Sequence, residues 1–344
     1  MYKRQLVRYT AGAPADSYTI PDSLTYIGDY AFNGCSNLTN INVDDDNAYY
    51  SSFDGHLFDK QMTTLIRYAA GAPADSYTIP DSVTYIDYGA FYGCTALASI
   101  TIPDSVTEIG GIAFEGCPSL TSINVDDDNA YYSSLDGHLF DKQMTTLVRY
   151  AAGAPADSYT IPDSVTYIGD YAFNGCTALT SITIPDSITS IYGWTFGDCT
   201  GLASITIPDS VTYIDGGAFS GCSKLKNVYY TGTQEQWYNI NIDMSYNESL
   251  ENADIHFAPY AEYTKNEDGS LSLNISLPDN AVTDSSTIYV AGVSSTGELS
   301  SLELIPASSY EEIIISAEDI ANIKIFVWDE FMRPLTVMKE IYIQ

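Results

Sequence analysis

Apolar residues recur along this chain in an order that predicts a short strand followed by a return to the core. In the segment Leu-Ala-Ser-Ile100-Thr-Ile102-Pro103, apolar and polar residues alternate, which is typical of a half-buried strand. Pro103 has no backbone N–H for a sheet, so we expect the strand to end there. Val106 and Ile109 then return to the interior three residues apart. The pattern therefore predicts Ile100 and Ile102 inside and their polar neighbours outside.

This unit repeats with a fixed period. Phe114 and Cys117 complete it from an expected short helical turn, and the cysteines within the two groups 94–117 and 176–222 are 23 residues apart. A period of this size is the signature of a solenoid in which each coil covers its neighbour's apolar face. Strands stacked about 4.8 Å apart give a parallel sheet about 40 Å long. They are expected at about 18–20, 41–43, 77–79, 100–102, 123–125, 159–161, 182–184, 205–207 and 228–230.

The consensus Leu-x-x-Ile-x-Ile-Pro-x-x-Val-x-x-Ile-Gly-x-x-Ala-Phe-x-x-Cys resembles the BspA-like (Treponema pallidum-type) leucine-rich repeats over about residues 6–257. The resemblance implies a curved solenoid on a bacterial surface or secreted protein. It also implies a role as an adhesin for host matrix proteins or other microbes.

The repeat ends before the chain does. Residues 1–257 are expected to form a leucine-rich repeat solenoid with a parallel β-sheet and short helical turns, closed from about 228 by a cap in which Trp237 covers the last coil. Residues 258–344 lack cysteine and the repeat, and their strand-like segments predict a small all-β sandwich. These segments are 271–277, 288–290, 302–305, 313–315 and 323–328.

A 36-residue insertion interrupts the period twice. Residues 42–86 and 124–168 differ only at positions 53/135 and 66/148, which indicates a recent duplication. We interpret the insertion as a β-hairpin or an irregular rung that bulges from the solenoid. A third partial copy begins the chain, because residues 6–35 match 147–176 at all but two positions. The first five residues do not match, and we hypothesise that the natural protein extends upstream and that its signal peptide is missing here.

Charge narrows the classes of partner. Thirteen basic and 45 acidic residues give a net charge of −32, which repels nucleic acid and anionic membranes. The same charge suits solubility, a cationic partner or divalent cations. No stretch approaches the about 18 apolar residues of a membrane span.

Candidate chemistry is sparse. The six cysteines share one repeat position, which favours a buried column of thiols over a disulfide framework, although pairs in adjacent coils are within geometric reach. His56, His138 and His256 lack metal-ligand spacing and are read as structural or surface residues. Asp44–Asn47 and Asp126–Asn129 are read as turns, with calcium binding left open. We expect no cofactor and no metal.

Two sets of residues are candidates for ligand contact. The position before the second core isoleucine holds Tyr26, Tyr85, Tyr167 and Tyr213, and tyrosine offers a large contact area at low entropic cost. The outward strand positions include Thr101, Thr183 and Thr206. Packing of the tyrosines over neighbouring coils is the competing interpretation. We therefore expect a non-enzymatic extracellular or cell-surface protein that binds a host or microbial protein or glycan. The alternatives are the recognition portion of a larger secreted hydrolase truncated at its N-terminus, and a scaffold that extends something else outward.

Overall fold

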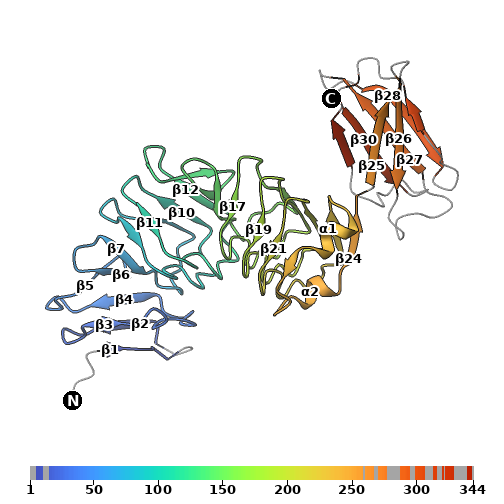
Figure 1. The fold of residues 1–344 in the computed structure, drawn as a ribbon. Helices are drawn as coiled ribbons and strands as arrows, with labels where there is room; N and C mark the ends of the chain where they lie inside the picture. The colour runs from blue at the N-terminus through green and yellow to red at the C-terminus, as the bar shows by residue number, and fades with distance from the viewer. Residues whose placement is uncertain are drawn as a thin grey trace.

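The computed structural model describes residues 5–10, 15–258, 260–266, 270–276, 287–294, 299–306, 313–315, 320, 322–328 and 339–342. Up to β24 the chain forms a β-solenoid of about 11 turns, stacked along an arc in Figure 1. The nine predicted strands are all present, and a tenth follows them. They are β2 (Ser17–Ile20), β4 (Asn40–Val43), β8 (Ser76–Thr78), β10 (Ser99–Ile102), β12 (Ser122–Val125), β16 (Ser158–Thr160), β18 (Ser181–Thr183), β20 (Ser204–Ile207), β22 (Asn227–Tyr230) and β24 (Asp254–Phe257).

These strands form the main sheet, and they pair in parallel with one 23-residue repeat between partners, except that β22 and β24 are 27 residues apart. Ile100 lies opposite Ile123 and Ile182 opposite Ile205, so each isoleucine packs on its counterpart in the next coil. The predicted alternation is confirmed, since Ile100 and Ile102 are fully buried and Thr101 between them is half-exposed. The main sheet is divided into groups of two, three and five strands, and the divisions fall at the two insertions.

A second set of two-residue strands lies beside the main sheet, and outside the insertions one of them follows most main strands. They are β1 (Gln5–Leu6), β3 (Tyr26–Ile27), β9 (Tyr85–Ile86), β11 (Glu108–Ile109), β17 (Tyr167–Ile168), β19 (Ser190–Ile191), β21 (Tyr213–Ile214) and β23 (Asn241–Ile242). They pair in parallel as β1–β3, β9–β11 and β19–β21–β23, while β17 pairs with a strand of the second insertion.

The third side of each coil is a tight turn that carries the buried phenylalanine and cysteine. The expected helical turns are minimal: the backbone makes single turn bonds such as Cys94 N–H to Phe91 O, and Gly93 within that turn has a positive φ. The phenylalanine rings stack from coil to coil, with centroids 5.4 Å apart for Phe91 and Phe114. Phe196 stacks in the same way on both of its neighbours.

Each insertion supplies three strands. They are β5 (Tyr50–Phe53), β6 (His56–Asp59) and β7 (Thr64–Arg67), and in the second copy β13 (Tyr132–Leu135), β14 (His138–Asp141) and β15 (Thr146–Arg149). The first two strands form a hairpin whose Asp54-Gly55 turn has positive φ at both positions, as this tight turn requires. The third strand joins the second sheet beside β9 or β17. Leu57, Phe58 and Leu65 are fully buried, so the insertion lies inside the stack as an irregular rung.

The segment predicted as a cap is a further coil. It contains α1 (Gln234–Tyr238), β23, α2 (Glu248–Glu251) and β24, and both strands extend the sheets that precede them. Thr233 and Gln236 cap the start of α1 reciprocally. Trp237 is buried with its ring 5.2 Å from that of Tyr230, which joins the added coil to the core.

Beyond the solenoid, the described residues form two antiparallel sheets, drawn in orange and red in Figure 1. One is β25 (Tyr260–Lys265), β26 (Leu271–Ser276) and β29 (Ile313–Ile315), in that order. The other has the order β28 (Leu299–Pro306), β27 (Thr287–Val293), β30 (Asn322–Trp328) and β31 (Lys339–Tyr342). Leu271, Leu273 and Ile275 alternate as buried residues on β26, so one face of that sheet is covered.

Candidate ligand-binding groove

A groove of about 280 Å³ runs across the turns that follow the second set of strands. Its walls come from five coils, because residues as far apart in sequence as Tyr30 and Trp194 line the same hollow. We call it the aromatic groove. Its lining residues are Tyr30, Asn33, Tyr88, Tyr92, Ile112, Glu115, Tyr171, Asn174, Trp194 and Asp198.

Aromatic rings at both ends of the groove contact one another across coils. The hydroxyls of Tyr30 and Tyr88 are 2.9 Å apart and their rings meet edge to face. Tyr171 and Trp194 hold their rings within 6° of parallel, with centroids 6.4 Å apart. Tyr246 lies 6.1 Å beyond Trp194. These contacts fix several ring faces in a partly solvent-exposed hollow, which suits a surface that must bind without reordering.

The backbone beneath two of these rings is strained. Tyr171 and Trp194 both have φ of 60°, a left-handed conformation that costs an L side chain about 1 kcal/mol. Both occupy the position two residues before the buried phenylalanine, where Ile112 also has a positive φ of 49° and two other coils place Gly89 and Gly217 with φ of 61° and 72°. Glycine adopts this conformation freely. A large aromatic residue at a position suited to glycine therefore points to a role for the side chain itself.

Two arginines from the duplicated insertions hold the turns of the groove in place. Arg67 donates to the carbonyl oxygens of Gly89 and Tyr92, at 2.5 and 2.6 Å. Arg149 donates in the same way to the carbonyls of Tyr171 and Asn174. Both guanidinium groups are buried, and burial lowers the pKa of Arg67. Each insertion thus contributes one arginine whose guanidinium group is hydrogen-bonded to backbone carbonyl oxygens.

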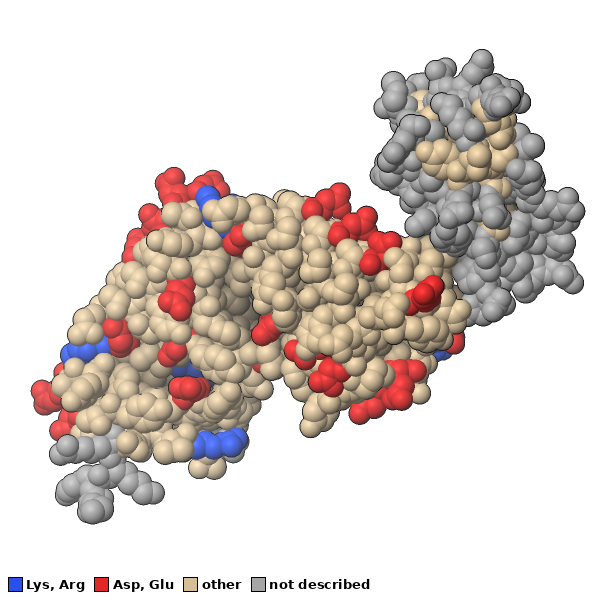
Figure 2. Space-filling view, in the orientation of Figure 1, with Lys and Arg blue, Asp and Glu red and all other residues tan. Residues whose placement is uncertain are grey.

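Carboxylates give the groove its charge. Glu115 is half-buried, and its pKa is raised mainly by burial and further by Asp198, while Arg149 opposes the rise. The pKa of Tyr88 is raised by its hydrogen bond with Tyr30 and by burial. Asp198 is exposed, and the lining contains no lysine and no arginine. Figure 2 shows acidic side chains spread over the visible face of the solenoid, with few basic ones.

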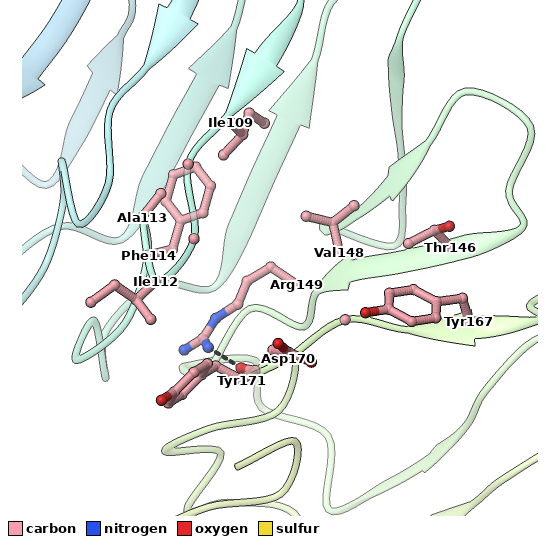
Figure 3. Close-up of a pocket in the computed structure, with 13 residues that line it drawn as sticks. Ile109, Ile112, Ala113, Phe114, Thr146, Val148, Arg149, Tyr167, Asp170 and Tyr171 are labelled. Atoms are coloured by element: carbon pink, nitrogen blue, oxygen red, sulfur yellow. Dashed lines mark hydrogen bonds between the residues drawn. The ribbon is translucent and has the colours of Figure 1, made fainter. Parts of the chain in front are cut away.

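A separate cleft of about 240 Å³ lies where the second set of strands is interrupted, between β11 and β15. In Figure 3, Ile112 and Phe114 stand on one side and Val148 and Tyr167 on the other, with the Arg149 guanidinium reaching toward Tyr171. The open edge of β11 is satisfied locally, because the N–H of Ile109 donates to the hydroxyl of Tyr132 at 3.1 Å. The same contact joins Ile27 and Tyr50 at the first insertion. In both places a tyrosine hydroxyl accepts the hydrogen bond that a neighbouring strand would otherwise accept.

The candidate tyrosines do not form one continuous row. Tyr26, Tyr85, Tyr167 and Tyr213 lie on β3, β9, β17 and β21, which belong to four different sheets. Tyr26 and Tyr167 are exposed, whereas Tyr85 and Tyr213 are half-buried. The hydroxyl of Tyr213 donates to Asp215 at 2.9 Å. Their part in ligand contact stays a prediction.

The candidate threonines lie on the main sheet, on other strands than the tyrosines. Thr183 and Thr206 are direct partners on β18 and β20, and Thr101 lies on β10 in the three-stranded group. Thr183 is exposed and the other two are half-exposed. The structure therefore brings two of the three threonines together and brings none of them into the aromatic groove.

The cysteines match the expectation of buried thiols. All six are free and buried, and Cys117, Cys199 and Cys222 donate to the carbonyl of the phenylalanine in the preceding coil at 3.0–3.1 Å. A thiol in this column therefore helps to join adjacent coils.

The remaining candidates have structural roles. Asn47 is fully buried and links Pro21, Leu24 and the start of β5 through its side-chain amide. Asp44 accepts from the N–H of Asp46, which is the expected turn. His56 and His138 are buried, whereas His256 is partly exposed. Among the residues with a described placement, no group of three potential ligands is arranged to hold a metal ion.

Sequence reasoning missed the aromatic groove. Eight of the ten lining residues fall in two columns of the repeat, two positions before the buried phenylalanine and one position after it, and our sequence reasoning followed neither column. One signal was present: the position two before the phenylalanine alternates between glycine and large residues such as Tyr171 and Trp194. An aromatic residue where other coils use glycine is the pattern that identifies the site.

Comparison with known proteins assigns the repeat to a family. The model of the BspA type leucine-rich repeat region matches residues 11–66, 68–146 and 150–259 in six copies. The chain belongs to the BspA-type leucine-rich repeat family. No curated protein matches it.

Several solved structures are similar to the chain. A leucine-rich repeat protein from Eubacterium ventriosum is 27% identical over 60% of this chain and 58% of that one, with a TM-score of 0.40. A leucine rich cell surface protein from Faecalibacterium prausnitzii is 26% identical over 70% and 86%, with a TM-score of 0.38. The pneumococcal vaccine antigen PcpA is 21% identical over 70% and 55%, with a TM-score of 0.39. The chain thus spans little more than half of two of these proteins.

Proposed function

We propose that this BspA-type protein is a non-catalytic recognition protein of the bacterial surface or the extracellular medium, and that it binds a protein or glycan through the solenoid. The observation that carries the proposal is the aromatic groove, in which Tyr171 and Trp194 hold partly exposed rings on strained backbone. Strain of this kind persists at functional sites where the side chain repays its cost. A structural role alone would favour glycine, as at position 217.

The family supports a surface location, because BspA-type repeats are typical of surface and secreted proteins. No helix among the residues described is long and apolar enough to span a membrane. We further propose that the two C-terminal sheets pack as a small sandwich, which serves as a spacer or attachment module. The alternating burial of Leu271, Leu273 and Ile275 supports this packing.

A binding screen tests the function. The full chain is presented to arrays of extracellular matrix proteins and of host and microbial glycans, beside a variant in which Tyr171→Gly and Trp194→Gly are combined. Glycine fits both positions, since Gly89 and Gly217 occupy their equivalents, so the variant should fold. We expect at least one ligand that the natural chain binds and the variant loses. Equal signals from the two chains for every ligand would contradict a groove-based function.

A further inference from the structure

We infer that the aromatic groove binds an arginine- or lysine-bearing segment of a protein partner, with the cationic side chain over the Tyr171 and Trp194 rings and beside Glu115 and Asp198. This inference rests on the proposed function and adds the chemical class of the ligand. It follows from three features of the groove, namely its ring faces, its excess of carboxylates and its backbone design.

The ring faces are the first feature. Tyrosine and tryptophan carry negative charge on their faces and attract a cation placed over them within about 6 Å, tryptophan most strongly. Tyr171 and Trp194 hold their rings parallel, and Gly217 packs against the indole, since a Cβ there would lie 3.0–3.3 Å from three of its ring atoms. The cation must therefore stack on the ring surface that Gly217 does not cover. A guanidinium group is planar and stacks on such faces, so arginine fits this pair better than lysine does.

The carboxylates are the second feature. Glu115 and Asp198 approach closely enough that Asp198 raises the pKa of Glu115. Arg149 is a buried cation that lowers the pKa of Glu115, and its terminal nitrogens donate to the carbonyls of Tyr171 and Asn174. Two carboxylates therefore face one buried cation, and the groove retains a net negative charge that a cationic side chain would neutralise. The net charge of −32 attracts the same partner over longer range.

The backbone design is the third feature. Arg149 fixes the turn that carries Tyr171, and Arg67 fixes the turn that carries Tyr92. Ring positions are thus set before a ligand arrives, and little ordering entropy is lost on binding. A neutral glycan could also stack on these rings and donate hydroxyls to the carboxylates, but it would leave their charge in place.

Peptide titration tests the ligand class. The probe is Ac-(Gly-Gly-Arg)₃-NH₂, and its control replaces arginine by citrulline, a neutral residue of nearly the same shape. Binding to the full chain is measured by calorimetry and by tryptophan fluorescence. We expect the arginine peptide to bind at least tenfold more tightly than the citrulline peptide. Trp194→Leu leaves the net charge unchanged and should weaken the binding of the arginine peptide about tenfold.

A matched pair of variants separates the groove from the general acidic field. Glu115→Gln and Asp104→Asn each remove one negative charge, the first in the groove and the second in an exposed turn outside it. We expect Glu115→Gln to weaken the affinity for the arginine peptide about fivefold, and Asp104→Asn to weaken it less than twofold. Equal effects of the two variants, or equal binding of the two peptides, would overturn the inference.

A neutral oligosaccharide, cellohexaose, distinguishes the failure of this inference from that of the proposed function. If cellohexaose binds and Trp194→Leu abolishes its binding while the arginine peptide is unaffected, the groove is a glycan site. The proposed function then stands and the cationic partner is rejected. If neither probe depends on Trp194, the groove is not the recognition site, and both proposals fail.

Discussion

Acid should destabilise the solenoid through a pair of duplicated histidines. His56 and His138 are each 4% exposed, stacked on Tyr68 and Tyr150 with ring centroids 3.9 and 3.8 Å apart. In each copy the ring Nδ1 accepts a hydrogen bond from a backbone N–H, that of Ala69 or its counterpart, at 3.2 Å. A proton on Nδ1 would break that bond. Both sites therefore require the neutral ring.

The magnitude follows from the pKa of these groups. Burial lowers the pKa of His56 and His138 from 6.5 to about 4. The unfolded chain then binds protons that the folded chain does not, so stability is full above pH 6.5 and falls as the pH drops toward 4. A difference of one pKa unit corresponds to about 1.4 kcal/mol, which gives about 2 kcal/mol per histidine at pH 5 and about 3 below pH 4.

Urea unfolding followed by circular dichroism between pH 7.5 and 5 measures the effect. The control carries His56→Asn and His138→Asn, because the asparagine oxygen can accept the same backbone hydrogen bond and does not titrate. This variant should be less stable at neutral pH, since it loses the ring stacking, but it should lose about 4 kcal/mol less on acidification. Carboxylates contribute equally to both chains. If the stability of the two chains had the same pH dependence, the conclusion that both histidines are buried and neutral would be refuted.

Three further outcomes are expected. Phe196→Ala should destabilise the chain by about 3–5 kcal/mol and Phe114→Ala by less, because Phe114 stacks on one neighbour and Phe196 on two; equal thermal melting shifts would contradict the stacked column. Thiol titration under denaturant should find six free thiols, and melting should not respond to reductant; a count of two or fewer would show cross-linked columns. Trp194→Gly should be about 1 kcal/mol more stable than Trp194→Ala in urea unfolding, because only glycine relieves the positive φ; the opposite order would remove the strain argument.

The regular part of the fold was predictable because one physical rule repeats. Each repeat has alternating isoleucines such as Ile100 and Ile102, a proline that ends the strand, and a phenylalanine in register. Stacked coils bury all of these apolar side chains at once. The insertions were less accessible to this reasoning. The sequence around Asp54-Gly55 predicts a hairpin, but only the stacked neighbours reveal that Leu57 and Phe58 are fully buried within the solenoid.

The groove could not be predicted for a related reason. Eight of its ten lining residues fall in two columns of the repeat, and the stacking of five coils brings Tyr30 and Trp194 of one column to the same hollow although 164 positions separate them. Repeat periodicity says which residues share a column and not which columns enclose a hollow. The predicted stripe of tyrosines followed a different column, and the strain at Tyr171 and Trp194 is recognised only when the backbone angles are known.

The location of the binding surface is the central claim, and one comparison of affinities tests it most directly. For a ligand recovered in the screen, the dissociation constant is measured for a groove variant, Tyr171→Gly with Trp194→Gly, and for a strand variant, Tyr26→Ser with Tyr167→Ser. Both variants replace two tyrosine or tryptophan rings, and neither changes the net charge. The groove variant should bind at least tenfold more weakly, and the strand variant should stay within twofold of the natural chain. A strand variant that loses binding while the groove variant keeps it would place recognition on the strands and contradict the account.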